Sequence, residues 1–118
     1  MKTTLIKKRG EMRRQPLTNC HDGEGALDWT NVLDPSEVEG RHLHFLHDDV
    51  LAPGVSIGLH THDEEEYYYI ISGKGTMTLN GERSTIEAGD ITAIYPGGSH
   101  ALVNDGDEDL RVLVIGLR

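Results

Sequence analysis

Residues 54–73 read GVSIGLHTHDEEEYYYIISG, a stretch that combines strand-like alternation with a cluster of polar side chains. His60 and His62 are two residues apart, so in an extended chain both imidazoles point to the same side. Glu66 follows across the acidic turn of residues 63–65, and alternation places its carboxylate on that same side of the next strand. Two imidazoles and a facing carboxylate form a donor set suited to a divalent transition metal.

Beyond residue 40 the chain alternates short strand-like segments with turn signals. The Asn80-Gly81 pair is the strongest of these signals, because both residues tolerate the backbone of a two-residue hairpin. Segments of strand type cover residues 42–50, 55–62, 66–71, 76–79, 82–86, 91–95, 100–103 and 110–117. Several short strands separated by regular turns predict an all-β, antiparallel sandwich or barrel in one domain.

Residues 1–40 differ from the rest of the chain. Residues 1–26 are polar and show little periodicity. Residues 34–37 (DPSE) predict a helix start, with an N-cap, a proline and an acidic third position, and Gly40 ends that helix within one turn. We therefore expect an N-terminal arm and strand region over residues 1–40, packed on the barrel or on a partner subunit, and a barrel over residues 41–118.

The formal net charge is −9 at pH 7, but it is unevenly distributed. Residues 1–14 hold six basic residues and one acidic residue, whereas residues 15–118 hold five basic and 19 acidic residues. The acidic body would repel the phosphates of nucleic acid, so we expect no nucleic-acid partner. No apolar run approaches the roughly 20 residues of a membrane span, and Lys7 interrupts the N-terminus where a signal peptide would stay apolar. These features predict a cytoplasmic protein without a membrane partner.

A second motif with a histidine begins near residue 89. Its members are Gly89, Gly97, His100 and Asn104, with Tyr95 and Pro96 at the bend before the histidine. The two motifs resemble the paired motifs of the cupin family. The first matches the family spacing in full: five residues separate Gly54 from His60, one separates His60 from His62, three separate His62 from Glu66, and six precede Gly73.

The second motif matches with one departure, because Tyr95 occupies a position that is proline in the family and Pro96 follows it. The 15 residues between the motifs fit the short spacing of small microbial cupins. More loosely, residues 19–25 (NCHDGEG) and 56–62 (SIGLHTH) resemble the oxalate-decarboxylase-like group of small single-domain cupins. The resemblance covers residues 41–118.

The resemblance implies an antiparallel β-barrel of jelly-roll type, with about six to eight strands and one divalent metal ion inside. It places that metal on His60, His62, Glu66 and His100. Glu64 and Glu65 compete with Glu66 as a ligand. Alternation favours Glu64 or Glu66, and the family spacing favours Glu66. This donor set suits Mn, Fe, Ni, Cu or Zn, so the identity of the metal stays open.

Tyr68 is the candidate for acid–base chemistry beside the metal, together with the carboxylate of Glu66. If Glu66 faces inward, alternation turns Tyr68 inward and turns Tyr69 and Ile71 outward. A phenol two residues from a ligand can exchange a proton with a bound substrate or hydrogen-bond to it, and cupin lyases carry a tyrosine at this offset. The alternative is that Tyr68 only packs in the barrel.

Three further histidines, His42, His44 and His47, occupy one predicted strand. His42 and His44 share a face and His47 lies on the other, and no carboxylate stands at a recognised metal-ligand spacing from them. We interpret them as strand residues, with His42 or His44 as candidates for lining the cavity. His21, in the loop of residues 19–25, is a candidate for approaching the mouth of the cavity.

Apolar residues at outward positions indicate a covered outer surface. Counting back from His60, alternation turns three apolar side chains outward. They are Val55, Ile57 and Leu59. Residues 110–117 are apolar on both faces, so either the N-terminal segment or a second subunit covers the outside. Small cupins are usually dimers, and the resemblance therefore implies a homodimer.

The motifs together predict a metal-binding small cupin. We expect a metal-dependent enzyme that acts on a small oxygen-rich anion, such as a dicarboxylate or keto acid, by decarboxylase or dioxygenase chemistry. Two alternatives stay open. One is a lyase or isomerase that uses Tyr68 as acid or base, and the other is a non-catalytic module that binds or senses a small ligand.

Overall fold

The computed structural model of the protein describes residues 3–38, 40 and 42–118. The described residues form ten strands: β1 (Arg13–Thr18), β2 (Ala26–Leu33), β3 (Leu43–Leu51), β4 (Ser56–Thr61), β5 (Glu66–Ser72), β6 (Lys74–Leu79), β7 (Glu82–Glu87), β8 (Ile91–Ile94), β9 (Ser99–Val103) and β10 (Leu110–Leu117). Three single 3₁₀ turns join them: η1 (Arg9–Glu11), η2 (Cys20–Asp22) and η3 (Pro35–Glu37). Within the described ranges, no helix is long and apolar enough to cross a membrane.

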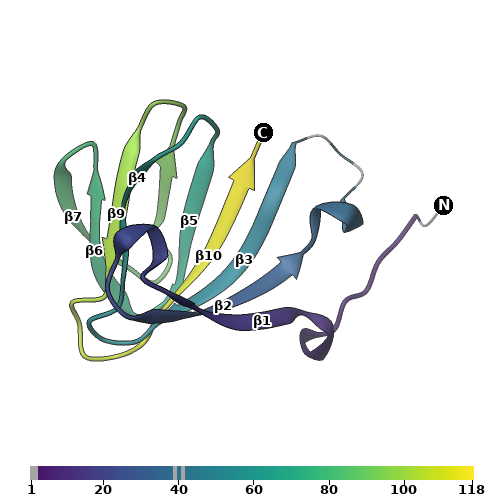
Figure 1. Ribbon diagram of the computed structural model, residues 1–118, viewed down its shortest axis with the longest axis horizontal. Helices are drawn as coiled ribbons and strands as arrows, with labels where there is room; N and C mark the ends of the chain where they lie inside the picture. The colour runs from purple at the N-terminus through teal and green to yellow at the C-terminus, as the bar shows by residue number, and fades with distance from the viewer. Residues whose placement is uncertain (1–2, 39, 41) are drawn as a thin grey trace.

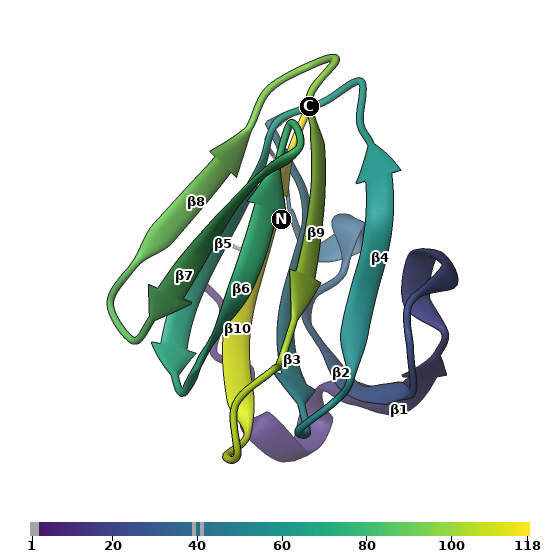
Figure 2. The same cartoon turned by 90° about the vertical axis from the view of Figure 1, so that its left-hand side faces the viewer.

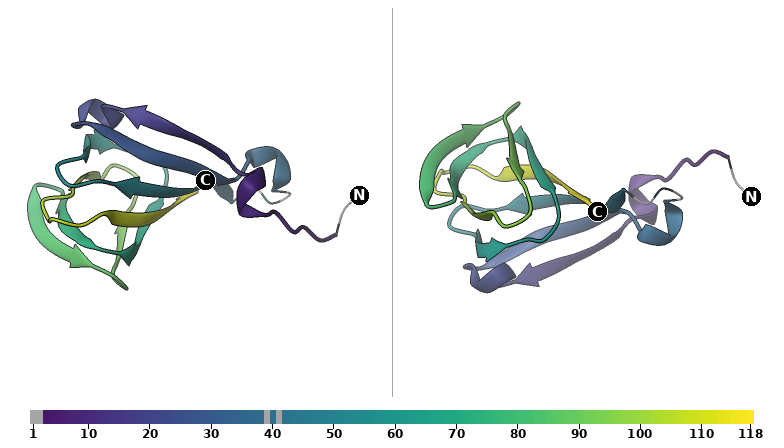
Figure 3. Two further views of the ribbon diagram at one scale, coloured as in Figure 1. Left: turned by 90° about the horizontal axis from the view of Figure 1, so that it is seen from below. Right: turned by 90° about the horizontal axis from the view of Figure 1, so that it is seen from above.

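The strands form two antiparallel sheets that curve against each other into a barrel (Figure 1). The larger sheet has the order β1-β2-β3-β10-β5-β8, and the smaller sheet has the order β4-β9-β6-β7. Strands β3 to β10 make the barrel, while β1 and β2 continue the larger sheet beyond β3, and residues 3–8 extend away from the barrel (Figure 3). The all-β, antiparallel jelly roll expected from the sequence is confirmed, and the ends of its eight barrel strands lie within two residues of their expected positions.

The inner face of the larger sheet changes from apolar to polar along its strands. Near the end of β5, Ile70 is fully buried beside Val112 of β10. Tyr68 comes two residues earlier, and Glu66 begins the strand. The inward side chains of β5 therefore become more polar from Ile70 to Tyr68 to Glu66. The apolar part supplies the folding energy, at about 1.5–3 kcal/mol for each large side chain fully removed from water. The polar end is therefore where a site can be built.

Local chemistry explains two of the connections. Asn80 and Gly81 both have positive φ, +48° and +83°, and join β6 to β7 as the expected two-residue hairpin. The backbone N–H of Asp34 donates to Glu37 Oε1 at 2.8 Å, which closes the start of η3. The single helical turn expected over these residues is confirmed.

The sequence predicted a strand region within residues 1–40 but did not place its two strands, β1 and β2. β1 reads RRQPLT and is exposed along almost its whole length, so it shows no apolar alternation. β2 does alternate at Leu27 and Trp29, which face the interior, but Thr30 and Asn31 are also buried and obscure the pattern. Both strands form because β2 pairs with β3, and β1 then pairs with β2.

The outward orientation expected for Val55 and Ile57 is wrong. Ile57 pairs with Leu102 of β9, but His60 pairs with His100, so three steps along β4 span two steps along β9. This bulge reverses the alternation, and Ile57 and His60 both face inward. Val55 and Ile57 belong to the apolar core, and only Leu59 of the expected outward set is exposed, at 64%.

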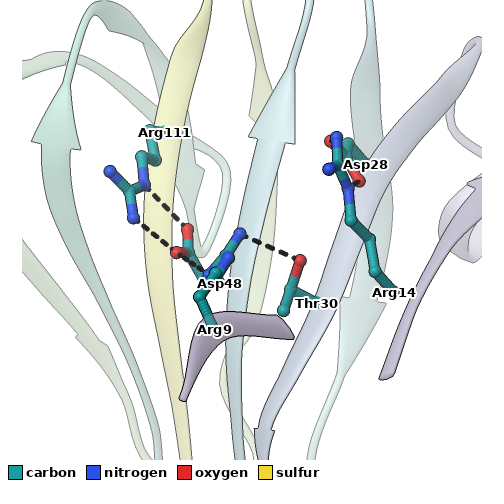
Figure 4. A network of polar contacts seen from close by, with 6 residues as sticks. All are labelled: Arg9, Arg14, Asp28, Thr30, Asp48 and Arg111. Carbon is teal, nitrogen blue, oxygen red and sulfur yellow. Dashed lines mark hydrogen bonds and ion pairs between the residues drawn. The ribbon is translucent and has the colours of Figure 1, made fainter. Parts of the chain in front are cut away.

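A buried carboxylate on the outer face of the larger sheet connects the N-terminal arm to the barrel (Figure 4). Arg111 Nε and Nη2 donate to the two oxygens of Asp48 at 2.9 and 2.6 Å. Arg9 Nη1 donates to Asp48 Oδ2 at 2.7 Å, and its Nη2 donates to Thr30 Oγ1 at 3.1 Å. The hydrogen bonds from Arg111 and Arg9 hold the pKa of Asp48 below its usual value although burial opposes them. Arg9 thereby fixes residues before β1 to the surface of β2 and β3.

Replacing Arg111 by Ala should destabilise the protein by roughly 2 kcal/mol, because it leaves a buried carboxylate with one partner. Arg14 offers a matched control, since its bidentate pair with Asp28 is exposed. Arg14→Ala should destabilise the protein much less, because water screens an exposed ion pair. Urea unfolding of both variants measures the difference, and equal losses would contradict a buried role for Asp48.

Candidate metal centre

Four side chains from both sheets converge inside the barrel. His60 lies on β4, His62 follows that strand, Glu66 begins β5 and His100 lies on β9. One nitrogen or oxygen atom of each lies within 4.8 Å of those of the other three. Glu66 and His100 are buried, so the group belongs to the interior and is not a surface cluster. The structure thus brings together all four residues that the sequence marked as candidate ligands.

The donor atoms of these side chains point at one another. His100 Nε2 lies 3.0 Å from His60 Nε2 and 3.1 Å from Glu66 Oε1. His62 Nε2 lies 3.2 Å from Glu66 Oε2, yet it is buried and has no hydrogen-bond partner. A buried polar atom without a partner is costly, and a metal ion between the four donors would satisfy it. The residues present therefore fit a divalent transition metal.

The protonation states also suit coordination. His60 Nδ1 lies 2.7 Å from the carbonyl oxygen of Gly58, which only accepts, so the ring proton is on Nδ1 and Nε2 is free to bind. Burial lowers the pKa of His60 to about 4, so its imidazole is neutral at pH 7. Burial alone would raise the pKa of Glu66, but the hydrogen bond with His100 and the charge of His62 outweigh it and keep the carboxylate ionised.

The bend before β9 ties the two sequence motifs together. Gly97 takes a φ of +91°, and its N–H donates to the carbonyl of His62 at 2.9 Å. The N–H of Gly98 donates to the carbonyl of Tyr95 at 2.9 Å and closes the turn. The exchange of the family's proline for Tyr95 therefore leaves a closed turn that delivers His100 to the site.

Glu64, the competing carboxylate, lies elsewhere. Its Oε2 is 2.8 Å from His44 Nδ1, and both side chains are 40% exposed. His44 thus has a carboxylate partner that no recognised sequence spacing indicated, because the turn between β4 and β5 brings Glu64 to β3. The geometry leaves Glu66 as the carboxylate that faces His62 and His100.

The inward histidine of β3 is His47, and not His42 or His44. It pairs with Val114 of β10, and its ring lies between Phe45 and Trp29, with centroids 4.9 Å from each. Burial lowers its pKa to about 4. His47 is therefore a neutral residue that lines the interior and packs against two aromatic rings.

Tyr68 faces inward beside the site, as expected. It is 3% exposed, and its ring centroid lies 4.8 Å from that of His100. Tyr69 and Ile71 face outward, at 41% and 37% exposed. Burial, followed by the negative charges of Glu66 and Asp49, raises the pKa of Tyr68 well above its usual value. At neutral pH the hydroxyl is therefore a proton donor and not a base.

Two groups near the centre were not among the predicted site residues, although His21 was expected to approach the mouth of the cavity. His21 lies flat on His60, with ring centroids 3.7 Å apart and an interplanar angle of 10°. Asp49 faces the interior from β3 and is 4% exposed, and its Oδ1 has no hydrogen-bond partner. Burial, with the charges of Asp48 and Glu66, raises the pKa of Asp49 to about 8. No feature of the sequence marked Asp49 as buried.

A family model described as the cupin domain matches residues 48–116. An oxalate-binding protein of Thermotoga maritima is 32% identical over 114 residues, which cover 96% of this chain and 93% of that protein. The chain belongs to the cupin family. This cupin is also similar to the tetracenomycin polyketide synthase protein TcmJ of Streptomyces glaucescens, at 34% identity over 83 residues, which cover 70% of this chain and 55% of that protein.

Solved structures agree with this assignment. A predicted oxalate decarboxylase from Thermotoga maritima superposes on the cupin with a TM-score of 0.89 and 30% identity, covering 96% of this chain and 98% of that one. The polyketide cyclase RemF from Streptomyces resistomycificus shares the fold, with a TM-score of 0.80 and 17% identity over 98% of this chain and 80% of that one. Cupins commonly bind divalent metals, and the His-His-Glu-His cluster gives this cupin a donor set for one.

Adding Mn²⁺ or Zn²⁺ should raise the melting temperature of this cupin, because the ligands converge only in the folded chain. At a hundredfold excess over Kd the gain is about 2.7 kcal/mol, or roughly 10 °C. His62→Ala should remove most of this shift, whereas the control His44→Ala should keep it. Differential scanning fluorimetry measures both, and an equal shift in the two variants would refute the assignment.

The buried Asp49 predicts a pH dependence of stability. Its folded pKa, about 8, lies above the unfolded value of 3.8, so the native state holds a proton that the unfolded chain releases. Its contribution is complete below pH 4 and is lost as the pH rises toward 8. Relative to wild type, Asp49→Asn should therefore gain roughly 2–4 kcal/mol between pH 5 and pH 8. Urea unfolding of the chelator-treated protein tests this, with the exposed Asp107→Asn as control; parallel curves for Asp49→Asn and wild type would count against it.

Proposed function

We propose that this cupin is a metal-dependent enzyme that acts on a small oxygen-rich anion, with a dicarboxylate such as oxalate as the first candidate. The observation that carries the proposal is the placement of a protonated phenol, Tyr68, beside four converging donors in a buried interior. The name of the Thermotoga maritima relative, an oxalate-binding protein, supports this class of ligand. Decarboxylase or dioxygenase chemistry suits such a substrate.

His60, His62, Glu66 and His100 would hold the metal, and the metal when bound supplies Lewis-acid chemistry to substrate oxygens. Four protein donors leave coordination positions for a small ligand. The side chain of His62 is 22% exposed, whereas those of Glu66 and His100 are 5% and 1% exposed, so ligand approaches on the side of His62. Tyr68 then donates a hydrogen bond or a proton to an oxygen or carbon of the bound anion.

The positive charge that an anion needs does not come from the basic residues of the late strands. Arg111 binds Asp48 on the outer face of the larger sheet. Arg83 is exposed on the edge strand β7, where it pairs with Thr78 of β6. The adjacent Met77 faces the core, so Thr78 and Arg83 face away from it. In the proposed mechanism the metal would therefore supply the positive charge that attracts the anion. The histidines would hold the metal, and the hydroxyl of Tyr68 would orient the bound anion by a hydrogen bond.

A non-catalytic binding module is the second candidate. It is favoured by the complete burial of Tyr68 against His100, which also suits a packing role, and by a relative whose name describes binding. A lyase or isomerase that uses Tyr68 as acid remains within the enzyme proposal. The decarboxylase or dioxygenase, the lyase or isomerase and the binding module differ in the role of the Tyr68 hydroxyl.

The test is to load the protein with Mn²⁺, measure oxalate binding by calorimetry and assay turnover of oxalate and related dicarboxylates and keto acids. Tyr68→Phe should leave metal and ligand binding within a few-fold and reduce turnover by about 10²-fold or more. Tyr69→Phe, on the outer face, is the matched control and should change neither. Unchanged turnover in Tyr68→Phe would remove its acid role, and binding without any turnover in wild type would favour the binding module.

We also propose that the protein is a homodimer that uses the outer face of the larger sheet. Tyr69 of β5 pairs with Ile91 of β8 and Leu113 of β10, which makes a contiguous apolar strip. Ile91 is 61% exposed. Sedimentation should show a dimer at micromolar concentration that Ile91→Glu dissociates, whereas Leu59→Glu, equally exposed on the smaller sheet, should leave it intact. A monomeric wild type would exclude this proposal.

A further inference from the structure

The loop between β1 and β2 lies beside β4 in an unusual backbone conformation (Figure 2). Asn19, His21 and Asp22 have φ values of +52°, +50° and +63°. Residues with a Cβ rarely adopt the left-handed region, and each costs about 1 kcal/mol or more unless the surroundings compensate. Three such residues among four consecutive positions show that this loop is held in a particular shape.

Hydrogen bonds account for that shape. The side-chain amide of Asn19 donates to the carbonyl of Gly23 at 2.9 Å. The backbone N–H of Ser56 donates to the carbonyl of Glu24 at 2.9 Å, and the N–H of Glu24 donates to Ser56 Oγ at 2.8 Å. The loop is therefore closed on itself and fastened to the start of β4.

Glycines allow the loop to touch β4 directly. A Cβ on Gly58 would lie 2.0 Å from the carbonyl oxygen of His21, and a Cβ on Gly23 would lie 2.2 Å from that of Ser56. Neither contact is compatible with a side chain. Gly58 is also the residue whose carbonyl binds His60 Nδ1. The same short segment thus carries the loop and orients the ligand.

The loop places the His21 ring on the His60 ring. The rings are stacked at 3.7 Å and 10°, and the His21 ring is edge-on to His62, at 6.4 Å and 71°. The lone pair of an imidazole nitrogen lies in the plane of its ring, whereas the His21 ring covers the face of the His60 ring. His21 accordingly lies outside the group of four converging donors.

We propose that His21 is a positioning residue for the metal centre, and that the loop of residues 19–25 exists to hold its ring against His60. His60 is then fixed by the Gly58 carbonyl at Nδ1 and by a stacked ring over its face, which leaves Nε2 aimed at the other three donors. The inference rests on the proposed metal site. Partners that orient a ligand in this way typically contribute 10- to 100-fold in metal affinity.

The experiment uses Co²⁺, whose visible spectrum reports ligand geometry without any assay of activity. His21→Ala should weaken Co²⁺ binding about 10- to 100-fold and alter the spectrum. His21→Phe should restore most of the affinity, because a phenyl ring can stack on His60 but cannot coordinate. His44→Ala, at the paired histidine outside the centre, should match wild type. The melting temperature of the chelator-treated variants should change little, because His21 is exposed.

The outcomes separate this inference from the metal site itself. Wild type that fails to bind Co²⁺ would overturn the site and the inference together. Binding that is lost in His62→Ala but unchanged in His21→Ala would overturn only the inference. If His21→Phe is as weak as His21→Ala, then His21 acts as a ligand and not by stacking. A large loss of melting temperature in the metal-free His21→Ala variant would assign His21 to folding instead.

Discussion

The bulge in β4 between Ile57 and His60 is the constraint on which the rest of the site depends. A regular strand would turn either the apolar core residue or the histidine outward, since side chains alternate. The extra residue lets Ile57 pack against the core beside Leu102 and His60 face His100, two residues further along β9. Gly58, inside the bulge, gives its carbonyl to His60 Nδ1 and its open face to the loop of residues 19–25. Core, ligand and loop therefore meet within four residues.

The two faces of β3 carry carboxyl groups in different charge states. Asp48 and Asp49 are adjacent in the chain and both buried, but they have opposite surroundings. Asp48 faces outward, where two guanidinium groups neutralise it. Asp49 faces inward without a cation, and burial favours its neutral form. The outer carboxylate thus works as an attachment point for the N-terminal arm, whereas the inner one keeps its proton.

Most of the barrel and the four candidate ligands were predictable, because both depend on local signals. Turn residues set the strand ends, and the spacing of the two motifs selected His60, His62, Glu66 and His100. The failures depend on pairing between distant segments. The bulge is visible only in the register of β4 against β9, and β1 forms only because β2 offers it an edge. The contacts of His21 and of His44 each arise where a loop folds back on a strand, which no spacing rule encodes.

The interior provides neutral acids next to the four candidate metal ligands. A carboxylate anion only accepts hydrogen bonds, and a binding module could satisfy it with neutral donors. This interior offers two such neutral donors, Tyr68 and Asp49, because burial raises the pKa of both groups. An ionised Asp49 would also repel an anionic ligand. A buried acid with a raised pKa is also typical of sites that transfer protons, so the same pair suits both proposed functions: it can hydrogen-bond to a bound anion, or it can provide the proton that a reacting carboxylate requires.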